Sequence, residues 1–394
     1  MENPKIRFKG FTKDWEQRKF GSLLEETRNK TIFEDEDTLL SCAIDGMYLN
    51  SELFSHFRGS SNIGYLKVKK NDLILSAQNL HLGNCNVNLR FEHGIISPAY
   101  KVYELVGCNP LFMQAWVKKD STKDFFLKSS TEGASVCRKN IVWEELYKQE
   151  LPVPSIEEQT KVGEYFYSLD HLITLHQRKC EQTKKLKKYM LQKMFPQNGA
   201  KVPEIRFYGF TYDWEQRKLI DYLEVSSEKN RDNRFTKEDV LSVSGEYGIV
   251  NQIEFQGRSF AGASVSNYGV VENGDVVYTK SPLKSNPYGI IKTNKGIPGI
   301  VSTLYAVYKP KEITDSKFVQ IYFELDSRMN SYMHPLVNKG AKNDMKVSAE
   351  NALKGMVSFP KKDEQEMISL YFSTIDNLIT LHQRQHKLHL NMLL

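Results

Sequence analysis

The sequence has few cysteines and no long hydrophobic run. Its 394 residues include five cysteines, at positions 42, 85, 108, 137 and 180, and none of them forms a CxxC pair. An odd number without such spacing favours free thiols in a reducing compartment. No stretch of about 18 apolar residues occurs, and the opening MENPKIRFKG has no apolar signal-peptide core. The sequence therefore predicts a cytoplasmic protein.

Motifs of common enzymes are also missing. There is no GxxxxGK[ST] loop, no HExxH and no GxSxG. The segment SNPYG at 285–289 resembles the amino-methyltransferase motif, but it has one proline where that motif has two, and a structural turn is favoured. Histidines 382, 386 and 389 share a helical stripe, where polar residues set pairing more often than they bind metal. We predict no catalytic residue, no bound metal and no cofactor, although an unfamiliar enzyme stays open.

Composition indicates a folded chain with a basic balance. Hydrophobic residues make up 40% and charged residues 26%, which is enough to form real cores. The formal net charge is +6 and the pI is about 8.8. Such a balance suits an anionic partner without requiring one.

The chain repeats itself once. The segment PKIRFKGFTKDWEQRKF (4–20) returns as PEIRFYGFTYDWEQRKL (203–219), and PSIEEQTKVGEYFYSLDHLITLHQR (154–178) returns as PKKDEQEMISLYFSTIDNLITLHQR (360–384). Weaker matches keep the same order between these blocks, such as GIISPAYKVY (94–103) with GIVSTLYAVY (299–308). The sequence therefore predicts two similar units in series.

Each unit reads as a mixed globular part followed by a long helix. Short β-rich runs separated by Gly, Asn and Pro alternate with helical stretches over about 150 residues. A long helix then starts after Ser155, which can cap it, and can run to about Phe195, before Pro196. We expect an α+β fold with globular domains at 1–153 and 197–357, and with helices at 154–196 and 358–394.

Both predicted helices carry one apolar stripe with alternating spacings of three and four residues. Such a stripe is typical of a helix with one partner seam. We expect the two helices to pair as an antiparallel coiled coil, although each stripe could instead pack only on its own domain. The predicted seam residues are Phe166, Leu169, Leu172, His176, Phe372, Ile375, Leu378 and His382.

Two copies of an RF.GF...WE.R opening, a globular stretch, and an EQ motif leading into a long helix resemble the specificity subunits of type I restriction–modification systems. The resemblance rests on IRFKGFTKDWEQRK with LPVPSIEEQ and on IRFYGFTYDWEQRK with FPKKDEQ. It implies that each globular part is a target-recognition domain reading one half of a split double-stranded DNA site. It also implies two methyltransferase (modification) subunits and restriction/motor subunits as partners, which would use S-adenosylmethionine, ATP and Mg²⁺. The second helix departs from the pattern, because Leu394 falls opposite Lys188 and the sequence holds no counterpart of YMLQKMF (189–195). Either the chain is truncated or its last helix is short, so the far end of the spacer and the docking surface of the second partner stay open.

The segments in which the two copies differ most are the candidate DNA contacts. Amide and cationic side chains suit base edges and phosphates, although an ordinary polar loop would have a similar composition. The candidates of the first unit are Arg58, Gln78, Asn79, His81, Asn84, Asn86, Asn88, Arg90, Arg138 and Lys139. Those of the second are Arg258, Lys280, Lys284, Asn286, Tyr288, Lys292, Asn294, Lys295, Lys342 and Lys346. Two other functions stay open: a scaffold that joins proteins without touching DNA, and a methyltransferase or nuclease.

Overall fold

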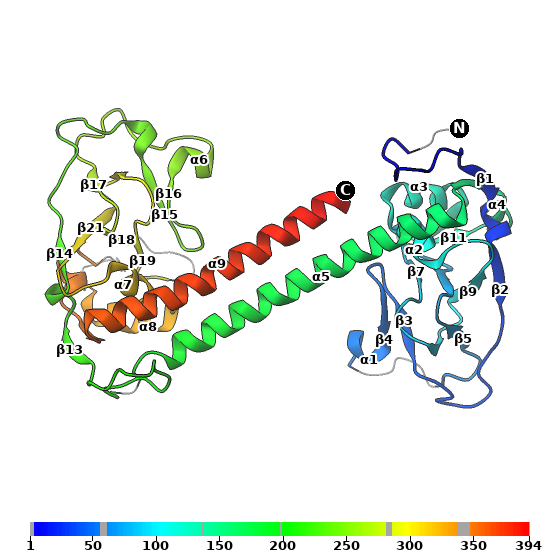
Figure 1. Ribbon diagram of the computed structural model, residues 1–394, viewed down its shortest axis with the longest axis horizontal. Helices are drawn as coiled ribbons and strands as arrows, with labels where there is room; N and C mark the ends of the chain where they lie inside the picture. Colours follow the sequence, from blue (N-terminus) through cyan, green and yellow to red (C-terminus); the bar gives the residue numbers. More distant parts are fainter. Residues whose placement is uncertain are drawn as a thin grey trace. The chain divides into compact units, whose positions relative to one another are not determined.

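The computed structural model describes residues 4–55, 61–135, 138–197, 199–280, 286–337 and 347–393. The chain divides into two units (Figure 1). Unit 1 holds residues 1–175 and 386–394, and unit 2 holds residues 176–385. The sequence-predicted α+β class is confirmed, since each unit combines small antiparallel sheets with short helices and part of both long helices.

Unit 1 is built on a four-stranded antiparallel sheet in the order β2-β9-β6-β7. These strands are β2 (Leu24–Thr27), β9 (Tyr100–Leu105), β6 (Leu73–Ser76) and β7 (Cys85–Val87). Four two-stranded pairs surround it: β1 (Glu16–Lys19) with β12 (Glu150–Val153), β3 (Leu40–Cys42) with β4 (Met47–Leu49), β5 (Leu66–Lys69) with β8 (His93–Ile96), and β10 (Ser130–Ser135) with β11 (Arg138–Ile141). The short helices are α1 (Asn50–Leu53), α2 (Pro110–Lys118), α3 (Asp120–Lys128) and α4 (Trp143–Lys148), with 3-10 turns η1 (Phe20–Leu23) and η2 (Leu80–Leu82).

Unit 2 repeats this plan. Its four-stranded sheet has the order β14-β21-β18-β19, formed by β14 (Leu223–Val225), β21 (Tyr305–Pro310), β18 (Val276–Thr279) and β19 (Ile291–Thr293). The pairs are β13 (Glu215–Lys218) with β22 (Met356–Phe359), β15 (Leu241–Ser244) with β16 (Gly248–Asn251), and β17 (Gly269–Val271) with β20 (Gly299–Val301). The helices are α6 (Gln252–Gln256), α7 (Ser316–Tyr322) and α8 (Asp326–Met333), with 3-10 turns η3 (Leu219–Asp221), η4 (Lys237–Asp239), η5 (His334–Leu336) and η6 (Asn351–Leu353). The internal repeat inferred from the sequence is therefore a repeat of structure.

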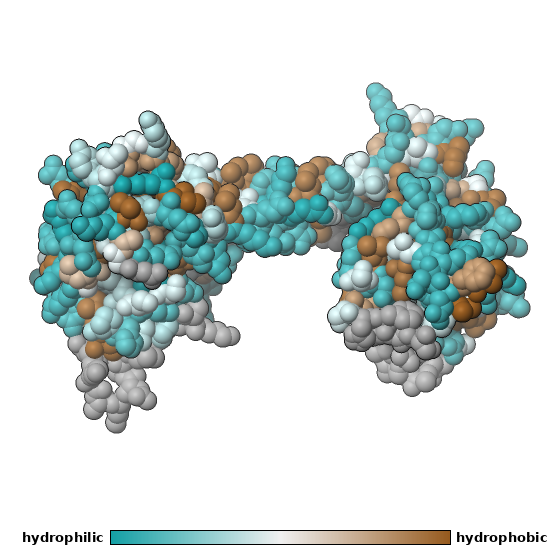
Figure 2. Space-filling view, turned by 90° about the horizontal axis from the view of Figure 1, so that it is seen from below, coloured by the Kyte–Doolittle hydropathy of each residue, from teal (hydrophilic) through white to brown (hydrophobic). Residues whose placement is uncertain are grey.

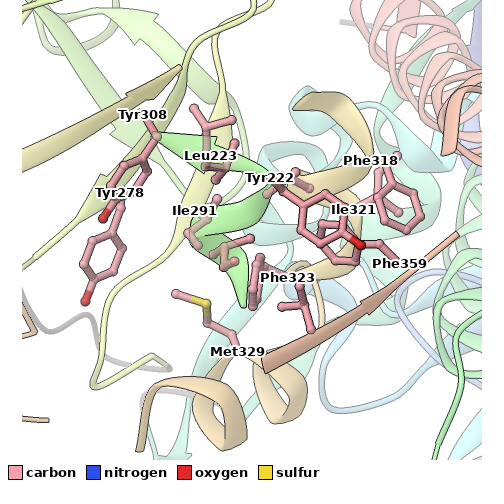
Figure 3. Close-up of a cluster of buried hydrophobic side chains, with 14 of the residues drawn as sticks. Tyr222, Leu223, Tyr278, Ile291, Tyr308, Phe318, Ile321, Phe323, Met329 and Phe359 are labelled. Carbon is pink, nitrogen blue, oxygen red and sulfur yellow. The ribbon is translucent and has the colours of Figure 1, made fainter. Parts of the chain in front are cut away.

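The central sheet of each unit is buried on both faces. Leu73 and Leu75 of β6 join one apolar cluster, while Ile74 between them joins another. In unit 2, Val276 and Tyr278 of β18 lie in the larger cluster, part of which is drawn with Tyr278 in Figure 3. Val277 lies in a second cluster. Side chains of a strand alternate between its faces, so a continuous apolar run covers both.

The repeated EQ motif fastens each long helix to its own unit. The Gln159 side chain accepts a hydrogen bond from the backbone N–H of Asn109 (2.7 Å), the residue that caps α2. In unit 2 the Gln365 side chain accepts one from Asp315 N–H (3.0 Å), and Asp315 caps α7. Gly163 permits the close approach in unit 1, because a Cβ there would lie 2.6 Å from the backbone nitrogen of Phe112.

The long helices are α5 (Ile156–Lys193) and α9 (Lys362–Leu393). Within unit 2 they run antiparallel, since the Nδ1 atoms of His176 and His382 lie 3.2 Å apart while Lys187, further along α5, pairs with Asp376, earlier in α9. The sequence-predicted pairing of the helices is thus confirmed.

Most predicted seam residues lie inward on the helices. Leu169, Phe372 and Ile375 are buried, and Phe166, Leu172, His176 and His382 are half-buried. Leu378 is the exception, because 43% of it is exposed while its neighbour Ile379 packs on the unit 2 core. The placement of Leu378 in the seam was wrong: a spacing of three or four left two adjacent positions open, and the helix turns the second of them inward.

Candidate nucleic-acid interface

An ion pair joins the start of each unit to its long helix. Arg7 donates two hydrogen bonds to Glu158 (2.6 and 2.7 Å), and Arg206 does the same to Glu364 (2.7 Å each). Both carboxylates are almost fully buried, so the paired and planar geometry compensates for their loss of water. Sequence reasoning did not single out these four residues, although all of them lie in the repeated IRF and EQ segments.

In unit 1 the structure brings two candidate segments together. The turn after β6 carries Gln78 and His81, and β11 carries Lys139, whose backbone N–H donates to the Gln78 carbonyl (3.1 Å). Gln78 is exposed, and Asn79 and Lys139 are half-exposed. Polar and cationic side chains from two separate parts of the chain thus share one surface at the end of β6.

His81 lies beneath this surface. Its ring is buried, and neither ring nitrogen has a hydrogen-bond partner among the described residues. Burial lowers the pKa of His81, and the positive charge of Lys139 lowers it further. A neutral imidazole at this position can accept or donate one hydrogen bond without adding charge.

Four other candidates of unit 1 lie differently. Asn84 is half-buried, whereas Asn86 and Asn88 are fully buried. The Asn86 amide donates to the Ala43 carbonyl (2.6 Å), and the Asn88 amide donates to the carbonyls of Lys69 and Phe91 (3.0 and 2.8 Å). The prediction that Asn86 and Asn88 contact DNA was wrong, because buried amides that satisfy the backbone have a structural role. Arg90 is exposed, but both of its terminal nitrogens pair with Glu52 (2.9 and 2.7 Å).

In unit 2 the equivalent surface follows β18. Lys280 is half-buried, and burial lowers its amine pKa, as does the charge of Lys229. Tyr288 is half-buried beside His334, with ring centroids 6.2 Å apart. Asn286 is buried, and its amide donates to Asp326 (2.9 Å). Lys280 and Tyr288 remain the accessible candidates of this segment.

Two candidates on and after β19 are interior residues. Asn294 repeats the role of Asn88, since its buried amide donates to the carbonyls of Glu272 and Ile297 (3.1 Å each). Lys292 is 9% exposed, and burial lowers its amine pKa although Glu324 lies near. The prediction that Asn294 and Lys292 contact DNA was therefore wrong, while Lys295 is exposed.

The remaining candidates are accessible or lie outside the described residues. Arg258 is exposed and stacks over Phe260 at 4.6 Å. Arg138 belongs to β11, but its side chain lies outside the described residues, as do Arg58, Lys284, Lys342 and Lys346.

A partly buried charge cluster joins the long helices to the unit 2 domain. Lys187 of α5 contacts Glu324 (2.5 Å), which follows α7, and Asp376 of α9 (2.6 Å). Burial lowers the pKa of Lys187, but the two carboxylates outweigh burial and leave the pKa raised. The lysine therefore stays charged and connects three elements.

Among the described residues, no group of three or more His, Cys, Asp or Glu side chains is placed to hold a metal ion. Within the same ranges, no helix is long and apolar enough to cross a membrane.

Fold and site together define a tandem-repeat protein with two α+β units of one plan, an antiparallel pair of long helices, and a different polar surface on each unit. Comparison with family models found no match. Among curated proteins the chain is similar to the type I restriction enzyme MjaVIII specificity subunit of Methanocaldococcus jannaschii, at 24% identity over 236 residues, or 55% of this chain and 51% of that protein. It is also similar to the putative type I restriction enzyme MjaX specificity subunit of the same organism, at 24% identity over 360 residues, or 84% of this chain and 73% of that protein.

The solved structures include one of the same fold. It is the type I restriction–modification S subunit from M. genitalium, with a TM-score of 0.59 at 12% identity, covering 100% of this chain and 97% of that one. The resemblance to type I specificity subunits seen in the sequence is therefore confirmed in sequence and in fold. The chain spans about half the length of the first curated relative.

Proposed function

We propose that this protein is the DNA-recognition subunit of a type I restriction–modification complex, in which each unit reads one half of a bipartite site. The observation that carries the proposal is the contrast within the repeat. The two units share sheets, register and helix attachment, yet the segments after β6 and β18 differ in sequence and present different polar side chains. One scaffold with two reading surfaces suits a site whose halves differ in sequence.

The long helices supply the surface for protein partners. Large apolar side chains of α9 face solvent: Leu370 is 64% exposed, Leu381 49% and Leu388 53%. Figure 2 shows hydrophobic surface along the long helices. Exposed apolar rows on helices favour helical partners. The partners of the proposed complex are two modification subunits and the restriction/motor subunits.

Chemistry belongs to the partners in this proposal. S-adenosylmethionine, ATP and Mg²⁺ would be used by the modification and restriction subunits, and this chain would place them on DNA. The proposed location is the cytoplasm, which suits the unpaired thiols of Cys42, Cys85, Cys108 and Cys180.

The test is methylation mapping with variants of one unit at a time. The chain is expressed with its modification subunit, and methylated adenines are read by single-molecule sequencing. Gln78→Ala should relax or change one half of the methylated site, and Tyr288→Ala should affect the other half. Lys128→Ala, an exposed change on α3, is the matched control and should leave the site intact. Unchanged sites in both variants, or changes in both halves from one variant, would contradict the proposal.

Salt dependence separates DNA recognition from a protein scaffold. With six to ten phosphates contacted, affinity of the complex for its site should fall about 10³–10⁵-fold between 50 and 200 mM salt. A scaffold that never touches DNA would give a complex whose DNA affinity is the same with and without this chain.

A further inference from the structure

The turn after β6 holds buried polar atoms that no described residue bonds. The turn is formed by η2, which ends at the left-handed Gly83 (φ 87°). Neither ring nitrogen of His81 in this turn has a hydrogen-bond partner in the described part of the chain. The side-chain oxygen of Asn84, three residues further on, is also buried and has none among those residues. A polar atom that loses water without gaining a hydrogen bond destabilises the folded chain, so these atoms need an explanation.

Other polar side chains of the same segment are bonded within the fold. Asn86 and Asn88 are fully buried, and their amides donate to backbone carbonyls at 2.6 to 3.0 Å. The fold of this segment is thus able to satisfy buried side chains. It satisfies these two amides and leaves the imidazole of His81 without such a bond from the described residues.

His81 lies just under the surface that carries Gln78 and Lys139. The residue is 9% exposed, and the positive charge of Lys139 acts on its ring. The η2 turn packs against α3 and contacts β11, and the Lys139 N–H of β11 donates to the Gln78 carbonyl (3.1 Å). The ring is therefore close to the polar side chains through which unit 1 is proposed to read DNA.

The imidazole differs chemically from the cations around it. Burial and the charge of Lys139 lower the pKa of His81 below its ordinary value, so the ring is neutral at pH 7. A neutral imidazole has one nitrogen that donates a hydrogen bond and one that accepts. The accepting nitrogen suits the exocyclic amino group of adenine or cytosine in the major groove, which lysine and arginine cannot bond because they only donate.

We propose that His81 is a base-reading residue of unit 1, whose ring nitrogens bond to a base edge of the DNA half-site. The inference rests on the proposed function of this chain. In the free protein the ring lowers stability, and in the complex the base edge restores the missing hydrogen bond. A base pair that does not supply the bond leaves a buried polar group unsatisfied, so the site discriminates against that base pair.

The first test measures the stability of the full chain. His81→Phe and His81→Leu each replace the ring nitrogens with apolar atoms at the same buried position. We expect the thermal midpoint to rise by about 2–4 °C, because a buried polar group without a partner is removed. Phe is larger than Leu, so the two variants together allow for the space available. A lower midpoint in both would show that the ring is bonded in the free chain, and would overturn the proposal.

The second test is methylation mapping of the same variants with the modification subunit. Discrimination should fall about 10–100-fold at one base pair of one half-site, while the other half-site stays unchanged. The slope of log affinity against log salt should also stay unchanged, because a neutral side chain releases no counterions. Asn88→Ala is the matched control, since this buried amide is bonded within the fold: its midpoint should fall and its methylated site should stay intact.

Gln78→Ala separates this inference from the proposed function. An altered half-site in Gln78→Ala, with intact sites in both His81 variants, would overturn the role of His81 alone. Intact sites in all three variants would contradict the proposed function as well. A smaller salt slope in the His81 variants would assign the residue to phosphate contact, and would also overturn base reading by His81.

Discussion

Buried carboxylates close the same turn in both units. Asp72 accepts a hydrogen bond from Lys69 N–H (2.7 Å), and Asp275 accepts one from Glu272 N–H (2.9 Å). Burial raises the pKa of both, and that of Asp72 reaches about 6. Each ionised carboxylate is therefore less favourable in the folded unit than in the unfolded chain.

Replacing Asp72 with Asn should change the pH dependence of unit 1. Because the folded pKa lies above the unfolded value of 3.8, the stability that protonated Asp72 contributes is complete below about pH 4 and is lost as pH rises through about 6. Asp72→Asn keeps an oxygen that accepts from Lys69 N–H but does not ionise. The free energy of unfolding of this variant, relative to the native chain, should therefore rise by up to roughly 3 kcal/mol as pH increases from about 4 to about 6. Urea unfolding followed by tryptophan fluorescence measures this, and parallel pH curves would contradict it. Asp275→Asn should change the pH dependence of the stability of unit 2 in the same direction.

The buried amides of Asn88 and Asn294 should affect stability without affecting specificity. Asn88→Ala removes two donors and leaves the carbonyls of Lys69 and Phe91 without these partners. We expect unit 1 to lose about 1–3 kcal/mol. Gln78→Ala, on the exposed turn, should leave stability within about 0.5 kcal/mol. Thermal unfolding and methylation mapping of both variants separate the two roles, and an altered methylated site in a folded Asn88→Ala chain would contradict the assignment.

These amides also mark the limit of sequence reasoning at the residue scale. Asn86, Asn88 and Asn294 lie in polar segments that suit DNA contact, and composition does not distinguish an amide facing solvent from one bonded to a backbone carbonyl. A better signal was the repeat itself, because Asn88 and Asn294 occupy equivalent positions in segments that otherwise differ. When the same residue stands at equivalent positions of two units whose surfaces otherwise differ, a role in the shared fold explains it better than DNA contact.

At the scale of elements, the long helices were the most predictable part of the chain. Their apolar spacing indicated the pairing, and Ser155 and Pro196 bracket α5 (Ile156–Lys193) closely. The apolar spacing did not predict the ion pairs that attach α5 to unit 2, because nothing in the sequence distinguishes Lys187 from the other lysines of this helix. Its partners Glu324 and Asp376 lie 137 and 189 positions away, and only the fold brings them together.

Lys187→Met should loosen the helix pair where it meets unit 2. The change removes the cation that contacts both Glu324 and Asp376, although Lys292 and Lys295 lie near these carboxylates. Lys187 is 13% exposed, so we expect the free energy of unfolding to fall by about 1–3 kcal/mol. Lys188→Met, at the exposed neighbouring position, is the matched control and should change stability by less than about 0.5 kcal/mol. Thermal unfolding followed by circular dichroism measures both, and equal effects of the two variants would contradict a specific role for Lys187.

At the scale of the whole molecule, the sequence predicted the repeat and the fold class because both depend on patterns kept in two copies. The packing of the end of α5 against unit 2 could not be found in this way. Phe195 is one apolar residue before Pro196 in the sequence, and only its ring contacts with Trp214 and Phe372 identify the surface that it covers.

The last prediction concerns the helices as a spacer between half-sites. Because His176 faces His382 in an antiparallel pair, insertions that keep the register must lie opposite each other. Seven residues between Gln177 and Arg178, and seven between Thr380 and Leu381, retain the seam, because the apolar pattern repeats about every seven residues. Each helix grows by about 10 Å. If the pair sets the distance between the reading surfaces, the gap in the methylated site should increase by about three base pairs, with both half-site sequences unchanged. Inserting seven residues in α5 alone should lower stability and abolish methylation, because the seam is then out of register. Methylation mapping measures the gap directly, and an unchanged gap in the double insertion would show that the long helices do not set the spacing.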